Sequence, residues 1–292
     1  MDWQSGDMSS DVEDRRGESG GGGGGFGFGG GGLGIVGFLV LLVISAVTGR
    51  NFIGGYLHGG GGSSAPVAQR ARTPESSQAE DRDAHLISWT LDDVQKTWTQ
   101  IFEQKGKTYR HAKLVMFRDQ TYSGCGTAES STGPFYCPAD QKVYIDLGFW
   151  DELKKFGGST ADFAQAYVVG HELGHHVQNL LGTESKVQRL MQEEPSEKNH
   201  LSVDLELQAD CYAGVWGHSL QQRGKINADD VKSALSAAAA VGDDHLQKMS
   251  GRAVSPESWT HGSSAQRETW FKRGFESGDP GQCNTFGGKS SN

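Results

Sequence analysis

The segment His171-Glu172-Leu173-Gly174-His175 lies inside an apolar stretch and constrains the fold more than any other feature of the chain. Two histidines four residues apart share one face of an α-helix, where both imidazoles can bind the same metal ion. Glu172 follows the first histidine and can hold a metal-bound water, as metal-assisted hydrolysis requires. A surface histidine pair would show the same spacing. The motif therefore needs support from a third ligand elsewhere in the chain.

Composition divides the 292 residues into four segments. Residues 1–32 are polar and then almost purely glycine, so we expect disorder there. Residues 33–53 begin with a dense apolar run, which predicts an uncleaved transmembrane anchor; a signal peptide and a buried hairpin are the alternatives. Residues 54–82 are rich in Gly, Ser and Pro and predict a flexible linker. Residues 83–292 have the size of one enzyme domain.

Charge bears on location and partners. Arg15 and Arg16 precede the apolar run and favour a cytoplasmic N-terminus. This predicts a single-pass inner-membrane protein whose domain lies on the extracytoplasmic side, periplasmic or extracellular. The net charge of −9 argues against a nucleic-acid partner, which would require a basic surface. The sequence does not indicate an oligomeric state.

Four cysteines lie in the predicted domain, and none belongs to a C-x-x-C pair. Cys125 and Cys137 bracket a short loop that contains glycine and proline, so we expect a local disulfide in an oxidising compartment. Cys211 and Cys283 are the candidates for a second bridge. The alternative for Cys211 is a small buried apolar residue on a helix.

Hydrophobic periodicity predicts an α+β domain that is mostly helical and has a small sheet. The first helix is expected to start at a capping box formed by Thr90 and Asp93. The motif helix is expected to begin near residue 160 and to end at Gly182. Further expected elements are strands at 113–117 and 142–147, helices at 184–191 and 197–222, a helix capped by Asn227, an irregular segment at 242–257, and a last helix capped by Ser263 or Ser264.

The best source of a third ligand is the segment Leu205–Asp210 of the long helix. Glu206 and Asp210 are four residues apart and share a face. One carboxylate can bind the metal, and the other can accept the second N–H of a ligand histidine. Apolar and small neighbours make a solvated helix face the weaker interpretation. Asp204 is a weaker ligand candidate. His176 is weaker still, because it points about 100° around the helix from His175.

Three segments together resemble the bacterial family of neutral zinc metallopeptidases. They are His171–His176, Glu206–Gly214 and Thr260–Arg267. The match to residues 133–140 and 270–280 is close to verbatim, and the resemblance covers essentially the whole chain. It implies a zincin-like domain of the gluzincin type with one Zn²⁺ per chain.

The resemblance also implies roles for individual residues. His171, His175 and Glu206 would bind the metal, and Asp210 would support a ligand histidine. Related gluzincins carry an H-P-x-x-x-x-R motif, whose proline is replaced here by Gly262.

We expect Glu172 to act as the general base. His261 is the candidate donor to the oxyanion, and its alternative is a helix-entry residue outside the site. Arg267 would orient the substrate or a carboxylate.

The expected function is that of a membrane-anchored zinc endopeptidase acting on a peptide or protein substrate. By analogy with zincins, we expect the strand at 143–147 to offer its edge to an extended substrate. Two alternatives stay open. One is a non-catalytic, zinc-stabilised binding module, which would have no need of Glu172. The other is a zinc hydrolase acting on a non-peptide substrate.

Overall fold

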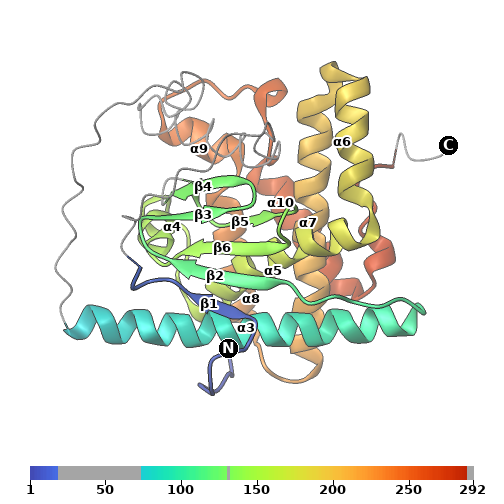
Figure 1. Ribbon diagram of the computed structural model, residues 1–292. Coiled ribbons are helices and arrows are strands. Elements are labelled where there is room, and N and C mark those ends of the chain that lie inside the picture. The colour runs from blue at the N-terminus through green and yellow to red at the C-terminus, as the bar shows by residue number, and fades with distance from the viewer. Residues whose placement is uncertain (19–73, 130–131, 288–292) are drawn as a thin grey trace, which may run out of the picture.

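Helices form most of the structure, and a small mixed sheet packs against them (Figure 1). The computed structural model describes residues 1–18, 74–129 and 132–287. The α+β class expected from hydrophobic periodicity is confirmed. The helices are α3 (Pro74–Gln104), α4 (Phe149–Lys155), α5 (Asp162–Leu181), α6 (Thr183–Glu193), α7 (Lys198–Gln222), α8 (Ala228–Ala240), α9 (Asp243–Met249) and α10 (Ser264–Ser277).

The four-stranded sheet has the order β1-β2-β6-β5 and contains both strand directions. Strands β1, β2 and β6 run parallel, whereas β5 is antiparallel to β6. Strands β3 and β4 pair as a separate antiparallel hairpin. Strand β6 is paired on both sides, so the prediction that residues 143–147 offer a free edge to a substrate is wrong. The free edge on this side of the sheet belongs to β5. The strands are β1 (Val12–Asp14), β2 (Lys113–Phe117), β3 (Gln120–Ser123), β4 (Gly126–Glu129), β5 (Phe135–Cys137) and β6 (Lys142–Asp146).

Both faces of the sheet are covered, which explains why β2 is a nearly continuous apolar run. Leu114 and Met116 belong to the main core, which the strands share with the helices. Val115 and Phe117 point to the opposite face, where they join a second cluster with Tyr144. The division follows the two-residue period of a strand. The sheet therefore separates the helical core from the β3–β4 side of the molecule.

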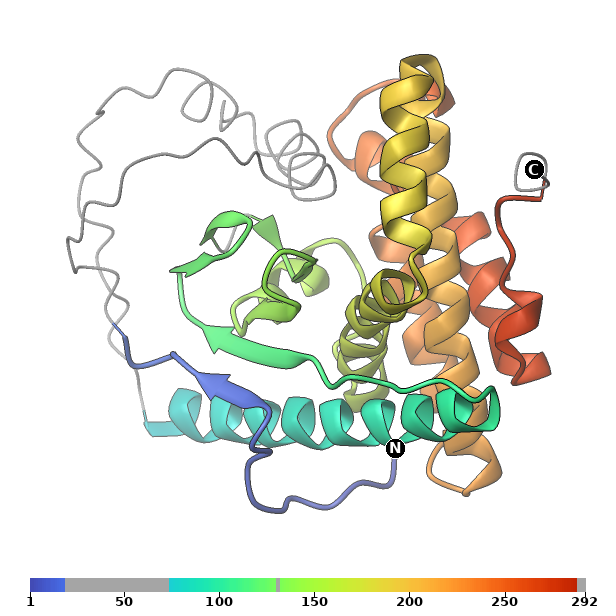
Figure 2. The same cartoon turned by 45° about the vertical axis from the view of Figure 1, so that its right-hand side comes forward.

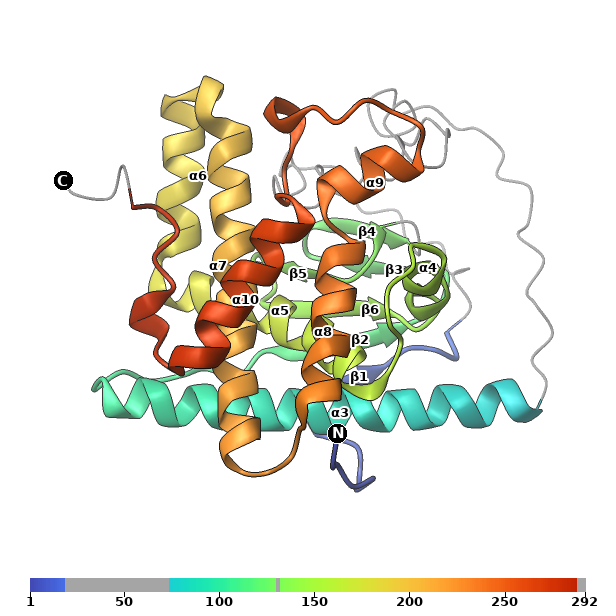
Figure 3. The same cartoon turned by 180° about the vertical axis from the view of Figure 1, so that it is seen from behind.

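The helices that matter for the site pack on one another behind the sheet. Figure 3 shows α10 lying across α7 beside α8, and α6 and α7 rise together as a pair in Figure 2. Two glycines set the distance between α7 and α10. A Cβ atom on Gly214 or Gly274 would collide with a main-chain oxygen of the facing helix. Only glycine permits this approach, which holds α10 and its Arg267 close to α7.

Capping residues end or start several helices at the positions expected from the sequence. Helix α5 ends at Gly182, which adopts a left-handed conformation with φ of 77°. Asn227 caps α8 through a capping box with Asp230. Ser263 caps α10 through a capping box with Gln266.

The start of α3 differs from the expectation. The helix begins at Pro74, which is well tolerated in a first helical turn. Thr90 lies inside it, and its hydroxyl donates to the carbonyl oxygen of Leu86 at 2.8 Å instead of capping the helix. The predicted linker through residue 82 and the domain start at residue 83 are therefore wrong, because the helix extends well upstream of its apolar stripe.

The expectation of disorder through residue 32 is wrong for residues 1–18. Val12 pairs with Leu114 as β1 joins β2. The ammonium group of Met1 lies 2.6 Å from the Asp230 carboxylate. Lys142 forms an ion pair with Glu13 at 2.6 Å. Backbone pairing and ion pairs hold this segment in place. Because they do so without an apolar stripe, hydrophobic periodicity gives no sign that the segment is ordered.

The remaining predictions for the N-terminal region lie outside the described residues. These are the glycine-rich segment from residue 19 onward, the anchor at 33–53 and the linker up to residue 73. Among the residues that the structure does describe, no helix has the length and apolar character needed to span a membrane.

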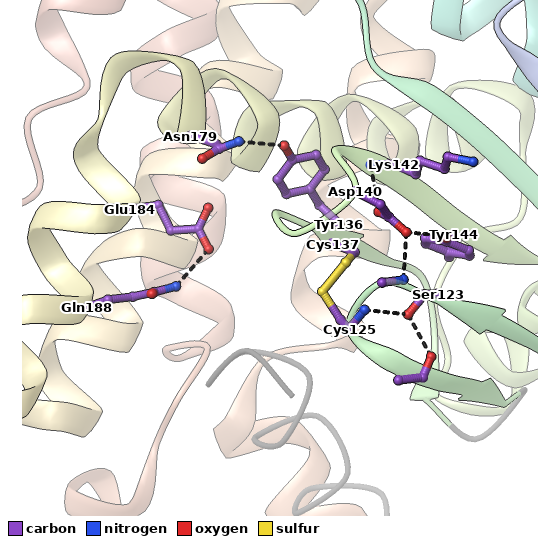
Figure 4. The surroundings of a disulfide bond; sticks show 12 residues. Ser123, Cys125, Tyr136, Cys137, Asp140, Lys142, Tyr144, Asn179, Glu184 and Gln188 are labelled. Atoms are coloured by element: carbon purple, nitrogen blue, oxygen red, sulfur yellow. Dashed lines mark hydrogen bonds between the residues drawn. A yellow bond between two sulfur atoms is a disulfide. The ribbon is translucent and has the colours of Figure 1, made fainter. Parts of the chain in front are cut away.

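Both expected disulfides are present. Cys125 is bonded to Cys137 and ties the β3–β4 hairpin to β5 (Figure 4). Next to this bridge, the Tyr136 hydroxyl accepts a hydrogen bond from Asn179 at 2.9 Å, which connects β5 to α5 (Figure 4). The second disulfide joins Cys211 of α7 to Cys283 and fastens the C-terminal segment to the helical core.

Candidate metal centre

The motif helix α5 and the long helix α7 approach closely at Gly174, the glycine inside the histidine motif. A Cβ atom at this position would lie only 3.0 Å from the main-chain oxygen of Ala209. Real Cβ contacts are rarely this short, so glycine is needed for the two helices to pack at this distance. Glu206 lies one turn before Ala209 on α7. The approach therefore carries its carboxylate to the histidines of α5.

Three side chains converge at this approach. Nε2 of His171 lies 3.1 Å from Oε2 of Glu206, and Nε2 of His175 lies 3.5 Å from Oε1 of the same carboxylate. One ligand atom from each residue falls within 4.8 Å of the other two, and all three residues are buried. No second group of this kind occurs in the described part of the chain. The structure thus brings together the ligand set expected from the sequence.

Each histidine is oriented by a hydrogen bond at its other ring nitrogen. Nδ1 of His171 lies 2.9 Å from Oδ1 of Asp210, and Nδ1 of His175 lies 2.9 Å from Oε1 of Gln178. The amide of Gln178 is itself fixed, since its nitrogen donates to the carbonyl oxygen of Leu205 at 2.7 Å. Both acceptors favour a proton on Nδ1, so Nε2 of each histidine is the atom that can bind a metal ion beside Glu206.

Two neutral imidazoles and one carboxylate form the donor set of a catalytic zinc site, so these residues fit Zn²⁺. The role of Gln178 was not among the expectations from the sequence. The signal was present, because Gln178 follows His175 by three residues and shares its helix face.

Asp210 is held by two further side chains in addition to His171. Arg267 donates from Nε to Oδ2 at 2.8 Å and from an Nη to Oδ1 at 3.0 Å. The Tyr167 hydroxyl also donates to Oδ1. Burial alone would raise the pKa of Asp210, but Arg267 and His171 outweigh it and lower the pKa below its usual value. Of its two expected roles, Arg267 fulfils the orientation of a carboxylate.

The ligand set has a strong preference for a cation. Burial lowers the pKa of His171, but Asp210 and Glu206 raise it more, to about 10. Burial raises the pKa of Glu206, but His175 and His171 outweigh this and keep the pKa well below its usual range. Without a metal, the negative potential of these carboxylates attracts a proton to the imidazole. The same potential favours a divalent cation between the three side chains.

Glu172 lines the same cavity as the three ligands. It is buried, and that burial raises the pKa of its carboxyl group above the usual value. A general base operates best with a pKa near the working pH, so the direction of this shift suits proton transfer. Position and environment both support the role expected for Glu172.

His261 also lines this cavity, because Asp243 holds the loop that carries it. Oδ2 of Asp243 accepts the backbone N–H groups of Thr260, His261 and Gly262 at 2.7, 2.7 and 3.0 Å. Its Oδ1 lies 3.2 Å from Nδ1 of His261. Gly262 has φ of 88°, which proline cannot adopt. The loop conformation therefore requires a residue other than proline at position 262, and glycine meets this requirement.

Asp243 was missed, because residues 242–257 were expected to be irregular. In fact Asp243 begins α9, and burial of its carboxylate is compensated by His261 and three backbone donors. These interactions lower the pKa of Asp243 despite its burial. Asp243 in turn raises the pKa of His261 against the lowering effect of burial.

The two weaker ligand candidates lie elsewhere. His176 points away from the centre, with Nδ1 at 3.0 Å from the Tyr136 hydroxyl and Nε2 at 2.6 Å from the carbonyl oxygen of Arg110. Asp204 lines a different cavity, between α6, α7 and the C-terminal segment. Neither belongs to the metal centre.

Comparison with known proteins identifies the family. Residues 1–286 match the family described as "Putative neutral zinc metallopeptidase", and the chain belongs to this family. "Uncharacterized protein YpfJ" of Escherichia coli K12 is 52% identical over 290 residues, which cover 98% of this chain and 99% of that protein. "Uncharacterized protein Rv2575" of Mycobacterium tuberculosis H37Rv is 44% identical over 189 residues, which cover 61% of this chain and 63% of that protein. No solved structure matches the chain.

Proposed function

We propose that this protein is a zinc-dependent endopeptidase with a zincin-type domain. The observation that carries the proposal is the joint position of Glu172 and the His171, His175 and Glu206 cluster in one cavity. A purely structural zinc site is usually closed by four protein ligands and needs no buried carboxylate beside it. Three features support the zincin assignment. Helix α5 carries two ligands, helix α7 carries the third, and the sheet has an antiparallel edge strand.

The three ligands would hold Zn²⁺, which lowers the pKa of a bound water to about 7 and polarises a carbonyl group. Glu172 accepts a proton from the attacking water and passes it to the leaving nitrogen. Its raised pKa suits both transfers. His261 donates a hydrogen bond to the developing oxyanion, and Asp243 fixes the imidazole for this task. Asp210 and Gln178 keep the ligand histidines in one tautomer.

The two disulfides support an extracytoplasmic location, since such bonds persist in oxidising compartments. We propose that the domain acts there on peptide or protein substrates.

The test is cleavage of a mixture of unfolded proteins by the purified full chain, with zinc measured by mass spectrometry on the same sample. We expect zinc-dependent cleavage that a chelator abolishes. Glu172→Gln should retain zinc and lose at least a hundredfold in rate, in line with removal of a general base. Glu184→Gln is the matched control, because Glu184 is equally buried but does not line this cavity. Full activity of Glu172→Gln would exclude the proposed role of Glu172.

A further inference from the structure

An apolar cavity of about 140 Å³ adjoins the metal centre. His171, Glu172 and His175 form one part of its lining. The rest is mainly aromatic and aliphatic, and it comes from four separate parts of the chain: β5, α4, α5 and the junction of α8 and α9. These side chains are Phe135, Phe149, Phe156, Val168, Val241 and Leu246.

The elements that supply this wall also position it relative to the reacting groups. Val168 lies on α5 four residues before Glu172, and therefore on the same helix face, one turn away. Phe135 begins β5, the edge strand of the sheet. Val241 and Leu246 come from the junction of α8 and α9, just before and after Asp243. The apolar wall and Glu172 thus line the same cavity.

Several wall residues are not closed off by the protein. Phe149, Phe156, Val168 and Val241 are only partly buried, although they pack against the main core. Apolar side chains that remain accessible around a concave site indicate a surface that a ligand covers. The described residues supply no side chain that fills the cavity.

Size and charge define the group that fits. An apolar protein cavity of about 150 Å³ accommodates one benzene molecule. A volume of about 140 Å³ therefore suits one phenylalanine, leucine, isoleucine or methionine side chain, and the larger indole of tryptophan does not fit. The charged groups in the lining belong to the metal centre or its supporting network. A charged substrate side chain would lose its hydration against the apolar wall without gaining a partner.

We propose that this cavity is the specificity subsite of the enzyme and receives one bulky apolar side chain next to the scissile bond. The proposal rests on the proposed peptidase function and names its substrate class, which is extended peptide containing Leu, Ile, Met or Phe. An extended peptide lying along β5 projects alternate side chains to one side, and this geometry presents one of them to the cavity.

The first experiment determines cleavage sites in a randomised peptide library by mass spectrometry, using the zinc-loaded full chain. We expect Leu, Ile, Met and Phe at one position flanking the cut to exceed Asp, Glu, Lys and Trp by at least tenfold. Cleavage without such a preference would overturn the subsite and leave the peptidase function standing. Absence of any cleavage would instead contradict the proposed function itself.

Two substitutions change the cavity in opposite directions. Val168→Phe fills it and should shift the preference at that position from Phe and Leu to Ala and Val. Leu246→Ala enlarges it and should raise the relative rate for Trp at least fivefold. Leu181→Ala is the matched control, since Leu181 lies at the far end of the same helix as Val168, is 38% exposed and does not line the cavity.

A binding measurement makes the test independent of turnover. Glu172→Gln is titrated with a fluorescent peptide carrying one central Leu and with its Leu→Asp counterpart. We expect at least tenfold tighter binding of the Leu peptide by fluorescence anisotropy, and loss of that difference in the Glu172→Gln, Val168→Phe double variant. Equal binding of both peptides by Glu172→Gln would refute the subsite, whether or not the active enzyme cleaves.

Discussion

Asp210→Asn is the substitution that most sharply tests how the metal centre is supported. The carboxylate of Asp210 is fully buried and is bonded to His171, Arg267 and Tyr167. Asparagine keeps the shape of the side chain and one oxygen, but it removes the negative charge. The side chain of Arg267 is only 4% exposed, and it would then keep only its longer ion pair with Glu206, at 3.9 Å.

The magnitude follows from these contacts. Breaking one partner of a buried ion pair costs about 3–5 kcal/mol. Since asparagine retains an acceptor, we expect about 3 kcal/mol, which lowers Tm by roughly 6–12 °C for a domain of this size. Loss of a carboxylate that orients a ligand histidine weakens metal affinity by about 10–100-fold. The variant should therefore be both less stable and poorer in zinc.

Thermal unfolding of the metal-free protein and zinc competition against a chelating dye measure the two effects separately. Asp204→Asn is the control on the same helix, because Asp204 lies outside the metal centre. We expect it to change Tm by less than about 2 °C and to leave zinc affinity unchanged. Wild-type zinc affinity in Asp210→Asn would refute the role assigned to the contact between Asp210 and His171.

Two further predictions concern the loop of His261 and the N-terminal strand. Asp243 raises the pKa of His261, so Asp243→Asn should move the alkaline limb of the pH profile of kcat to lower pH. The variant should also reduce kcat about tenfold at unchanged zinc content. An alkaline limb at the wild-type pH would exclude a role of Asp243 in catalysis. Because β1 is part of the domain sheet, a single membrane crossing between residues 18 and 74 would separate β1 from β2. Cysteines introduced at Ser5 and Lys154 should therefore react with an impermeant reagent from the same side of the membrane. Labelling from opposite sides would contradict the pairing of β1 with β2.

Much of the helical framework was predictable because its signals are local. The left-handed Gly182 ends α5, and the capping boxes at Asn227 and Ser263 start α8 and α10. The spacing of His171 and His175 and that of Glu206 and Asp210 were equally local, since each pair occupies one helix face. The pairing of these two faces was inferred from their chemistry, since no spacing within the sequence says which helices approach each other. The family resemblance then assigned Glu206 as the ligand and Asp210 as its support.

The rest depends on contacts between distant segments. β1 is three residues long, and two of them are acidic, so pairing with a strand about 100 residues away determines its structure. Asp243 lies in a segment whose sequence predicts irregular structure, and only the return of the chain at Thr260–Gly262 gives its carboxylate three backbone donors. The edge position of β5 likewise follows from the sheet order, which alternating hydrophobicity does not specify.

The proposed zinc peptidase activity is tested by restoring cleavage with metal. The purified full chain is stripped with a chelator, dialysed, and assayed on an unfolded protein substrate while Zn²⁺ is added back. We expect cleavage to return in proportion to bound zinc and to saturate at one ion per chain. Under the same conditions, Glu172→Gln should bind the ion without regaining activity. Saturation of the wild type with one zinc and no cleavage of any protein or peptide substrate would contradict the central claim.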